Sequence, residues 1–261
     1  MKVVAVVSPK GGVGKTTTAL SLCQSAASYG LKTLLIDYDN QANATASLVA
    51  LDSTLNCTNS FDLVESTSAI TPMTVTDKLD LLPAANKLTE LDGKDFELFF
   101  RLRERIRDQF SSRYDLVVID TPGHLGQRVI SAMASADAMY SPIELTKYSL
   151  QALEPMVDLQ RRVQSRFNPT LLFLGLLPNR VGNISVDTGL PIITQEREVY
   201  EILSNLFPIL GMIAQRRGIK DTLSVGGTVQ DISADASGKR AQEELNHFAD
   251  VVLEKLGLRS K

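Results

Sequence analysis

The residues best suited to chemistry lie in a glycine-rich segment near the N-terminus, SPKGGVGKTT at residues 8–17. Glycine has no Cβ, so such a segment can turn tightly and point successive backbone N–H groups at a phosphate. The lysine at its end can reach the β- and γ-phosphates, and the hydroxyl that follows can bind magnesium. The segment therefore predicts a nucleotide-binding loop, formed by Lys10, Gly11, Gly12, Val13, Gly14, Lys15, Thr16 and Thr17.

A magnesium nucleotide also needs a carboxylate at the end of a neighbouring buried strand. The apolar run LVVID at 116–120 places Asp120 where the chain would leave the sheet, and the TPG that follows resembles a loop able to sense a γ-phosphate. Taken alone, an aspartate there is more often a helix cap or a turn former. Beside the loop at 8–17, we expect Asp120 and Thr16 to bind magnesium.

Two further carboxylates follow another apolar run. The segment LLIDYDNQANAT at 34–45 carries Asp37 and Asp39, which would lie on the same side of an extended chain. Two acids this close repel each other unless magnesium and a water molecule lie near them. We expect Asp37 to contact magnesium, and one of the two carboxylates to orient a water for attack on the γ-phosphate. An acidic loop that caps a helix near Ala42 is the alternative.

The pattern of the chain predicts the elements that must position these groups. Short apolar runs alternate with amphipathic stretches, which is typical of a parallel sheet covered by helices on both faces. We expect one α/β domain over residues 1–261, with a single doubly wound, mostly parallel sheet flanked by helices. The strands are expected at 3–7, 33–36, 79–82, 116–119, 138–141, 171–177 and 208–213. The helices are expected at 15–28, 95–110, 125–135, 149–167, 195–206 and 238–256, with 56–77 as an irregular surface excursion.

Composition excludes several classes of protein. The chain has 261 residues, 44% of them hydrophobic and 22% charged, which is typical of a folded protein. Its apolar runs fall well short of the roughly 20 residues that span a membrane, and no leader precedes the first apolar run, so we expect a cytoplasmic location. A net charge of −3 argues against a globally basic nucleic-acid binder and leaves a local basic patch as the alternative.

The motifs together resemble one family. KGGVGKTT, with a second lysine at the front of the loop, is followed by IDYDNQANAT and VVIDTPG. This combination is similar to the deviant Walker ATPases, which include ParA, MinD and the nitrogenase iron protein, and ParA is the member it resembles most. LPAANKL at 82–88, YSPIEL at 140–145 and the segment 213–245 also fit the ParA pattern.

The resemblance implies roles for particular residues. Lys10 would reach across an ATP-dependent sandwich homodimer to the partner's phosphates, Asp39 would orient the attacking water, and Asp120 would be the Walker B acid. Asn179 would contact adenine, although Pro-Asn is also an ordinary turn after a strand. The family's usual DPQ reads Asp39-Asn40-Gln41 here, so we expect a less rigid loop after the catalytic acid.

The resemblance also implies a cellular role. A ParA-like protein would use ATP and magnesium to bind DNA without sequence preference and associate with the nucleoid. A ParB-like adaptor would stimulate hydrolysis, and the cycle would position a cargo, first of all a plasmid or chromosome. Ordinary solvated helix faces are the alternative for the basic residues. The candidate DNA contacts are Arg216 and Arg217 first, then Lys220, Lys239 and Arg240.

Three relatives or classes compete with this interpretation. The iron protein needs cysteine ligands for a cluster, and Cys23 and Cys57 are not placed to supply them. A MinD-like membrane-positioning ATPase would end in a basic apolar helix, whereas the apolar residues of DVVLEKLGLRSK are better explained as the inner face of a docked helix, so a membrane partner is not favoured. A metabolic ligase of the dethiobiotin synthetase type would pass the γ-phosphate to a small substrate and ignore DNA.

Overall fold

The computed structural model describes residues 1–49, 57–94 and 97–259. One sheet of eight strands runs through it in the order β3-β4-β2-β5-β1-β6-β7-β8. Only β3 runs antiparallel to its neighbour. The strands are β1 (Lys2–Val6), β2 (Thr33–Asp37), β3 (Met73–Thr76), β4 (Leu79–Leu82), β5 (Leu116–Asp120), β6 (Ala138–Ile143), β7 (Leu172–Val181) and β8 (Ile213–Ala214).

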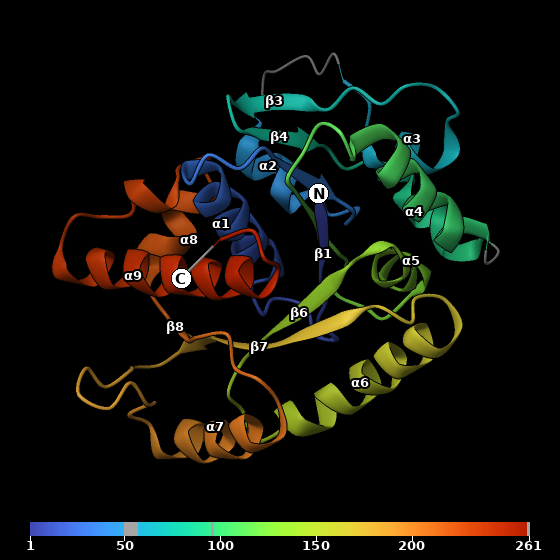
Figure 1. Ribbon diagram of the computed structural model, residues 1–261. Coiled ribbons are helices and arrows are strands. Elements are labelled where there is room, and N and C mark those ends of the chain that lie inside the picture. Colours follow the sequence, from blue (N-terminus) through green and yellow to red (C-terminus); the bar gives the residue numbers. More distant parts are fainter. Residues whose placement is uncertain (50–56, 95–96, 260–261) are drawn as a thin grey trace.

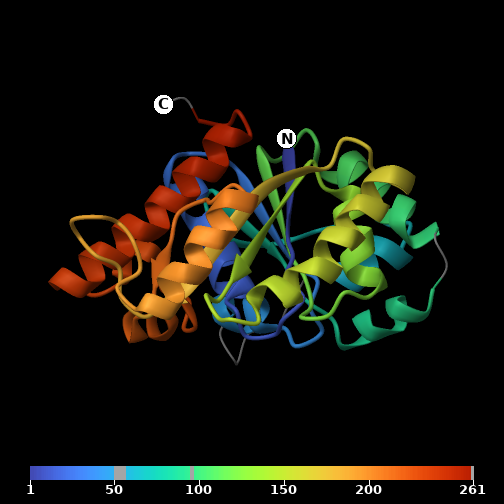
Figure 2. The same cartoon turned by 90° about the horizontal axis from the view of Figure 1, so that it is seen from below.

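Helices cover both faces of this sheet, as Figures 1 and 2 show. One face carries α1, α2, α8 and α9, and the other carries α3 to α7. The helices are α1 (Lys15–Ser28), α2 (Asn43–Leu48), α3 (Ser60–Glu65), α4 (Glu97–Phe110), α5 (Gln127–Ser135), α6 (Ser149–Arg166), α7 (Thr194–Leu206), α8 (Arg217–Leu223) and α9 (Ala236–Lys255). Two 3₁₀ helices span Asn86–Gly93 and Val229–Asp231.

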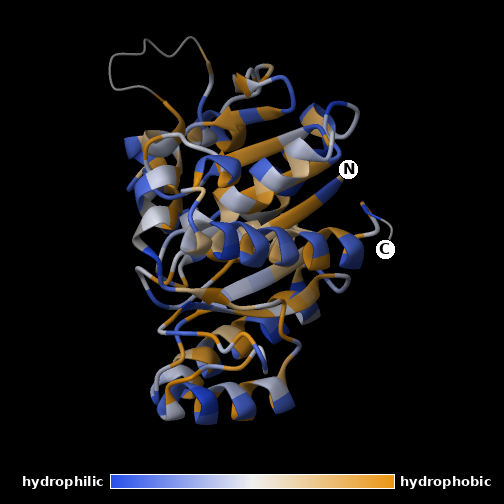
Figure 3. Ribbon diagram, turned by 90° about the vertical axis from the view of Figure 1, so that its left-hand side faces the viewer, coloured by the Kyte–Doolittle hydropathy of each residue, from blue (hydrophilic) through white to orange (hydrophobic). Residues whose placement is uncertain are grey.

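The central strands are apolar throughout because both of their faces are buried. In β1, Val3 and Ala5 belong to the core on the side of α3 to α7, while Val4 and Val6 belong to the core on the side of α1, α8 and α9. Side chains alternate between the faces of a strand, so each strand must supply apolar residues to both cores. Figure 3 shows strands in hydrophobic colours between helices that carry both kinds of residue. The expected doubly wound α/β fold is confirmed.

Two expectations about segments are wrong. The stretch 56–77 is not wholly irregular: from residue 57 on it contains α3 and β3, and Asn56 lies outside the described residues. Helix α3 is stabilised by a capping box between Asn59 and Asp62. The helix has only six residues, so its sequence shows little apolar periodicity. The expected strand at 208–213 is reduced to an isolated bridge at Ile209 and the two residues of β8.

The C-terminal helix packs into the protein as expected. Val252 and Leu253 of α9 are fully buried, and Leu256, just after the helix, is 7% exposed. Val251 and Leu258 pack against the same core. Across the described ranges, no helix is long and apolar enough to cross a membrane.

The topology brings the predicted site residues to one edge of the sheet. Asp37 at the end of β2 and Val6 at the end of β1 both pair with Asp120 at the end of β5. The glycine-rich segment follows β1 directly. Ligands of parallel α/β sheets bind beyond the carboxyl ends of the strands, where the strand order reverses, and β1 and β5 lie at this point.

Candidate nucleotide site

The glycine-rich segment forms a loop that opens directly into α1. Helix α1 begins at Lys15, and Gly14 before it has a φ of 96°, a left-handed conformation that suits glycine. The loop and the start of α1 line a cavity of about 410 Å³. The positive end of the helix dipole and the free N–H groups of its first turn favour an anion there. The loop therefore has the geometry of a phosphate site.

Lys15 is a buried cation among carboxylates. It is only 7% exposed. Burial lowers the pKa of its ammonium group, and the nearby carboxylates of Asp120 and Asp39 raise it. Lys15 thus supplies positive charge inside the cavity, where water screens it little.

Asp120 has the features of a magnesium ligand. It is 1% exposed, and neither carboxylate oxygen has a hydrogen-bond partner among the described residues. Burial raises its pKa to about 8, and the Asp37 carboxylate adds to this rise, while Thr16 and Lys15 oppose it. A buried carboxylate without partners is costly unless a cation reaches it. The arrangement therefore fits a magnesium ion near Asp120 and the Thr16 hydroxyl.

A protein-only metal cluster is not needed for this role. Among the described residues, no group of three or more His, Cys, Asp or Glu side chains could hold a metal ion. Magnesium commonly takes one or two protein ligands and completes its shell with phosphate oxygens and water. The site fits a metal that arrives with a nucleotide.

Asp37, the third expected magnesium ligand, is engaged by groups of the chain itself, and its contact with magnesium stays a prediction. Asp37 is fully buried, and burial raises the pKa of its carboxyl to about 6. Its Oδ2 accepts hydrogen bonds from the Thr45 backbone N–H and hydroxyl at 2.8 and 2.7 Å. Its Oδ1 accepts from the Asp39 N–H at 3.3 Å. Both oxygens are thus used to hold α2 and the loop before it, which a sequence pattern cannot show.

Asp39 lines the phosphate cavity, as expected. It opens a turn in which the Ala42 N–H donates to the Asp39 carbonyl at 2.9 Å. Its Oδ1 accepts a hydrogen bond from the Gln41 N–H at 3.1 Å. The side chain therefore faces the cavity from a turn that its own carboxylate helps to close. Asp39 does not cap α2, but Asp37 accepts the N–H of Thr45 in the first turn of that helix, so the alternative of an acidic loop that caps α2 is seen in Asp37.

The loop after Asp120 packs against the glycine-rich loop. The Thr121 hydroxyl donates to the Val6 carbonyl at 2.6 Å. A Cβ on Gly123 would lie 3.1 Å from the Gly11 Cα and 3.6 Å from the Lys15 Nζ. Residues 121–123 therefore lie directly against the phosphate-binding loop.

Lys10 lies on the outer side of the loop. Its side chain is 56% exposed, and its Nζ lies 2.6 Å from Glu144 Oε2 at the end of the β6 region. Arg180 reaches the other oxygen of the same carboxylate at 3.4 Å. Arg180 has a φ of 58°, which is uncommon for a residue other than glycine, and it lines the phosphate cavity. The sequence pattern assigned no role to Glu144 or Arg180, because their meeting depends on the tertiary fold.

Asn179 lies where a base-binding residue is expected. It lines a second cavity of about 500 Å³ beside Gly14 and Thr17. Its side-chain nitrogen donates to the Val13 carbonyl at 2.7 Å. A Cβ on Gly14 would lie 2.1 Å from this nitrogen, so Gly14 is needed for the close approach as well as for its φ. Asn179 is thus coupled to the phosphate loop across the sheet.

The structure separates the basic residues that were expected to bind DNA. Arg216 forms a two-pronged ion pair with Glu244 of α9, with Nη2 2.8 Å from Oε1, and its side chain is only 16% exposed. This internal pair would compete with a DNA contact by Arg216, whose expected place among the DNA contacts stays a prediction. Lys239 and Arg240 in α9 are exposed. The side chains of Arg217 and Lys220 lie outside the part of the chain that the structure describes.

The fold and the site define a nucleotide-binding protein of the P-loop class. A family model described as "AAA domain" matches residues 1–173. The sporulation initiation inhibitor protein Soj of Bacillus subtilis is 30% identical over 190 residues, which cover 67% of this chain and 71% of Soj. The chromosome-partitioning ATPase Soj of Thermus thermophilus is 33% identical over 178 residues, 67% of each chain. The chain belongs to the ParA/MinD superfamily of P-loop ATPases.

Solved structures share the fold at low sequence identity. The McdA–ATP complex from Cyanothece has a TM-score of 0.82 and 21% identity, over 100% of this chain and 98% of McdA. Cobyrinic acid a,c-diamide synthase from Mycobacterium smegmatis has a TM-score of 0.77 and 21% identity, over 98% of this chain and 96% of the synthase. The fold therefore occurs in a cobyrinic acid diamide synthase as well as in the ATP-bound McdA, and the fold alone does not decide the activity.

Proposed function

We propose that this chain is a ParA-like ATPase that binds magnesium ATP, forms a sandwich homodimer, attaches to DNA without sequence preference and positions a cargo. Plasmid or chromosome partition is the foremost role. The protein would be cytoplasmic and associate with the nucleoid. Slow ATP hydrolysis, stimulated by a ParB-like or other adaptor protein, would release the dimer from the nucleoid DNA. The observation that carries the nucleotide part is the buried Asp120 carboxylate, whose oxygens lack a hydrogen-bond partner within the described ranges and which interacts electrostatically with Lys15 and the Thr16 hydroxyl.

Each step of the cycle falls to residues already described. Lys15 and the N–H groups of residues 11–17 would hold the phosphates, while Thr16 and Asp120 would hold magnesium, which would neutralise phosphate charge. Asp39 would orient the attacking water. Asn179 would meet adenine with its amide oxygen, since its nitrogen already donates to Val13. Arg180 lines both cavities and would contact the nucleotide between phosphates and base.

Exposure of Lys10 supports the dimer. Its ammonium group lies outside the lining of the chain's own phosphate cavity, and among the described residues its ion-pair partner is the partly exposed Glu144. Such pairs contribute about 1 kcal/mol or less, so a partner's phosphates can replace Glu144. A cation delivered by the second subunit would stabilise phosphate charge as an arginine finger does, which couples dimerisation to ATP.

Lys239 and Arg240 are the described residues that we propose for the DNA surface. They lie exposed near the start of α9, and no ion pair engages either one within the described ranges. Two copies of this patch, aligned by a dimer, would neutralise backbone phosphates and give salt-sensitive binding. Arg217 and Lys220 stay predictions, and Arg216 serves first to join β8 to α9.

The test is co-sedimentation with a long DNA duplex of arbitrary sequence and, in parallel, with anionic liposomes. Each is done with ATP, with ADP and without nucleotide, at two salt concentrations. We expect pelleting with DNA only in ATP, weakened by salt and by Lys239→Ala/Arg240→Ala. The exposed pair Lys78→Ala/Lys87→Ala changes the net charge equally at another place and should bind DNA normally.

Other outcomes would replace the proposal. ATP-dependent pelleting with liposomes alone would establish the MinD-like membrane alternative. Pelleting with neither surface, together with fast turnover in the presence of a small carboxylate or amine acceptor, would favour a metabolic ligase. Normal DNA binding by the Lys239/Arg240 variant would move the DNA surface elsewhere.

A further inference from the structure

Arg128 is an almost fully buried arginine near the nucleotide site. It lies in the first turn of α5, and its residue is 1% exposed. A guanidinium group taken out of water needs carboxylate and carbonyl partners, because its desolvation is costly. The positions of those partners therefore show what this side chain holds together.

One edge of the guanidinium group, formed by Nε and Nη2, donates to Asp92. Arg128 Nε and Nη2 donate to Asp92 Oδ2 at 3.0 and 2.8 Å. Asp92 also accepts the Arg128 backbone N–H at 3.3 Å, so it fixes the start of α5 as well. His124, in the loop after Asp120, has its Nε2 3.9 Å from the same Oδ2. This side of the network is part of the framework of the protein.

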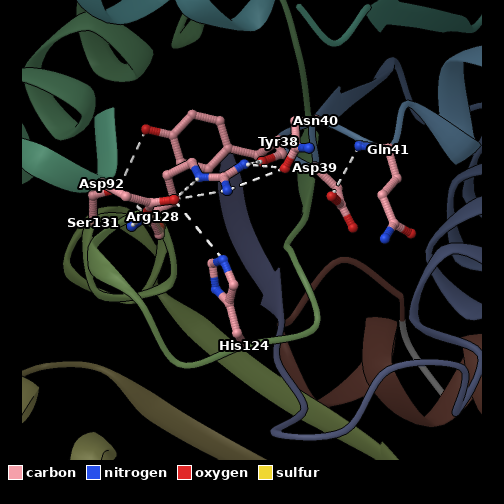
Figure 4. A network of polar contacts seen from close by, with 8 residues as sticks. All are labelled: Tyr38, Asp39, Asn40, Gln41, Asp92, His124, Arg128 and Ser131. Carbon is pink, nitrogen blue, oxygen red and sulfur yellow. Dashed lines mark hydrogen bonds and ion pairs between the residues drawn. The ribbon is translucent and has the colours of Figure 1, made fainter. Parts of the chain in front are cut away.

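The other edge of the guanidinium group, formed by Nη1 and Nη2, donates to the segment that carries Asp39. Arg128 Nη1 donates to the Tyr38 carbonyl at 3.3 Å. Nη1 and Nη2 both donate to Asn40 Oδ1, each at 3.2 Å. Figure 4 shows the guanidinium between Asp92 and this segment, with the Asp39 side chain pointing away from it beside Gln41. One side chain thus holds the residue before Asp39 and the residue after it.

The same segment is anchored at a second point. The Tyr38 side chain is fully buried, and its hydroxyl group lies 3.4 Å from the Ser131 hydroxyl one turn further along α5. Helix α5 therefore holds Tyr38 through both its ring and its carbonyl. The freedom that remains to Asp39 is the conformation of the turn 39–42, which begins at Asp39 and has Asn40 at its second position.

We infer that Arg128 is a positioning residue for Asp39 and acts through Asn40. The inference rests on the proposed role of Asp39 in orienting water. Proline is favoured at the second position of such a turn because its ring fixes φ, and Asn40 occupies that position here. The bonds from Arg128 to Asn40 supply by side-chain contacts the rigidity that a proline would supply covalently. The expectation of a less rigid loop is therefore replaced by one of a loop held from α5.

Three variants separate positioning from ordinary stabilisation. Arg128→Lys keeps the charge beside Asp92 but cannot reach both sides of Asp39. Asn40→Ala removes the loop's acceptor and leaves the Arg128–Asp92 pair in place, so it tests the inference even if Arg128→Lys folds poorly. We expect both to lower kcat about tenfold to a hundredfold, because misplacement by about 1 Å has effects of this size. ATP affinity should stay within about threefold of wild type, since neither residue lines the phosphate cavity.

Asn40→Pro is the rescue variant. It also lacks the acceptor, yet it should keep kcat near wild type and restore most of the kcat lost in Arg128→Lys, because the ring restricts the turn. A merely structural role would lower the melting temperature and affinity together with kcat, without rescue. Arg107→Lys is the matched control. Arg107 lies away from the site, where its Nη2 is 2.7 Å from Asp137 Oδ1, so this variant should lose stability but keep its kcat.

Asp39→Ala, measured in the same series, distinguishes failure of this inference from failure of the proposed function. If Asp39→Ala hydrolyses ATP normally, Asp39 is not the catalytic acid and the inference falls with it. If Asp39→Ala is inactive while Arg128→Lys and Asn40→Ala keep the wild-type kcat, the proposed function stands and only the positioning role is overturned.

Discussion

The two lysines of the phosphate-binding loop lie in opposite environments. Lys15 is 7% exposed and lies near the carboxylates of Asp120 and Asp39. The side chain of Lys10 is 56% exposed and pairs at the surface with Glu144. A buried cation acts on whatever its own cavity holds, whereas a surface cation in a weak pair is available to another molecule. The loop therefore has an inner end that serves its own subunit and an outer end suited to a partner.

Removal of the inner lysine should have the largest effect. Lys15→Ala takes the principal cation out of a buried phosphate site, so ATP affinity should fall at least about a hundredfold and turnover should be lost. Titration with a fluorescent ATP analogue measures this. Lys10→Ala is the matched comparison and should bind nucleotide as a monomer nearly normally; equal losses in both variants would break the distinction between the two ends.

Removal of Asp39 should affect turnover rather than binding. Asp39→Ala should lower kcat by about 10² to 10⁴, as expected for loss of a general base, while ATP affinity and ATP-dependent dimerisation persist. Single-turnover hydrolysis and size-exclusion chromatography with ATP measure the two properties. Undiminished hydrolysis would remove Asp39 from the catalytic role.

The inner end should also show a pH effect on stability. Burial raises the pKa of Asp120 to about 8 in the folded protein, against 3.8 for an exposed aspartate. The folded state therefore keeps a proton that the unfolded chain has lost, so this group's contribution to stability falls as pH rises from about 4 to about 8. Urea unfolding of the nucleotide-free protein across this range should show the decline, and Asp120→Asn should remove the part between about pH 6 and 8, while the part below about pH 6, where Asp37 titrates, remains. Magnesium ATP should stabilise the wild type most at the high end, where Asp120 is ionised.

The outer end should show the smallest effect. Glu144→Gln removes the negative charge that holds Lys10, so the ATP-dependent dimer should form up to about fivefold more tightly, the size expected for release of an exposed ion pair. Sedimentation velocity over a range of protein concentrations measures the dimer constant. A weaker dimer would mean that Glu144 orients Lys10 toward the partner instead of restraining it.

Features that depend on residues close together in the chain were mostly predictable from the sequence, whereas contacts between distant residues were not. The phosphate loop was predictable because its geometry depends on glycines, a lysine and a hydroxyl that are neighbours in the chain. The placement of Asp120 beside it was predictable because parallel strands end at one edge of a sheet. Helix α3 was missed because its signal is a four-residue capping box, and the burial of Arg128 was missed because arginine on a helix is normally exposed.

The sequence by itself determined the class of fold, the phosphate-binding loop and the identity of the acids near it, because local spacing and apolar patterning encode these directly. Only the tertiary structure decided which acid is engaged by the chain itself, since Asp37 accepts two hydrogen bonds from Thr45 while Asp120 has no such partner among the described residues. It also turned Arg216 toward Glu244 and joined Arg128 to Asn40, 88 positions apart in the chain. Charged side chains find their partners in space, and the folding of the whole chain determines which groups meet.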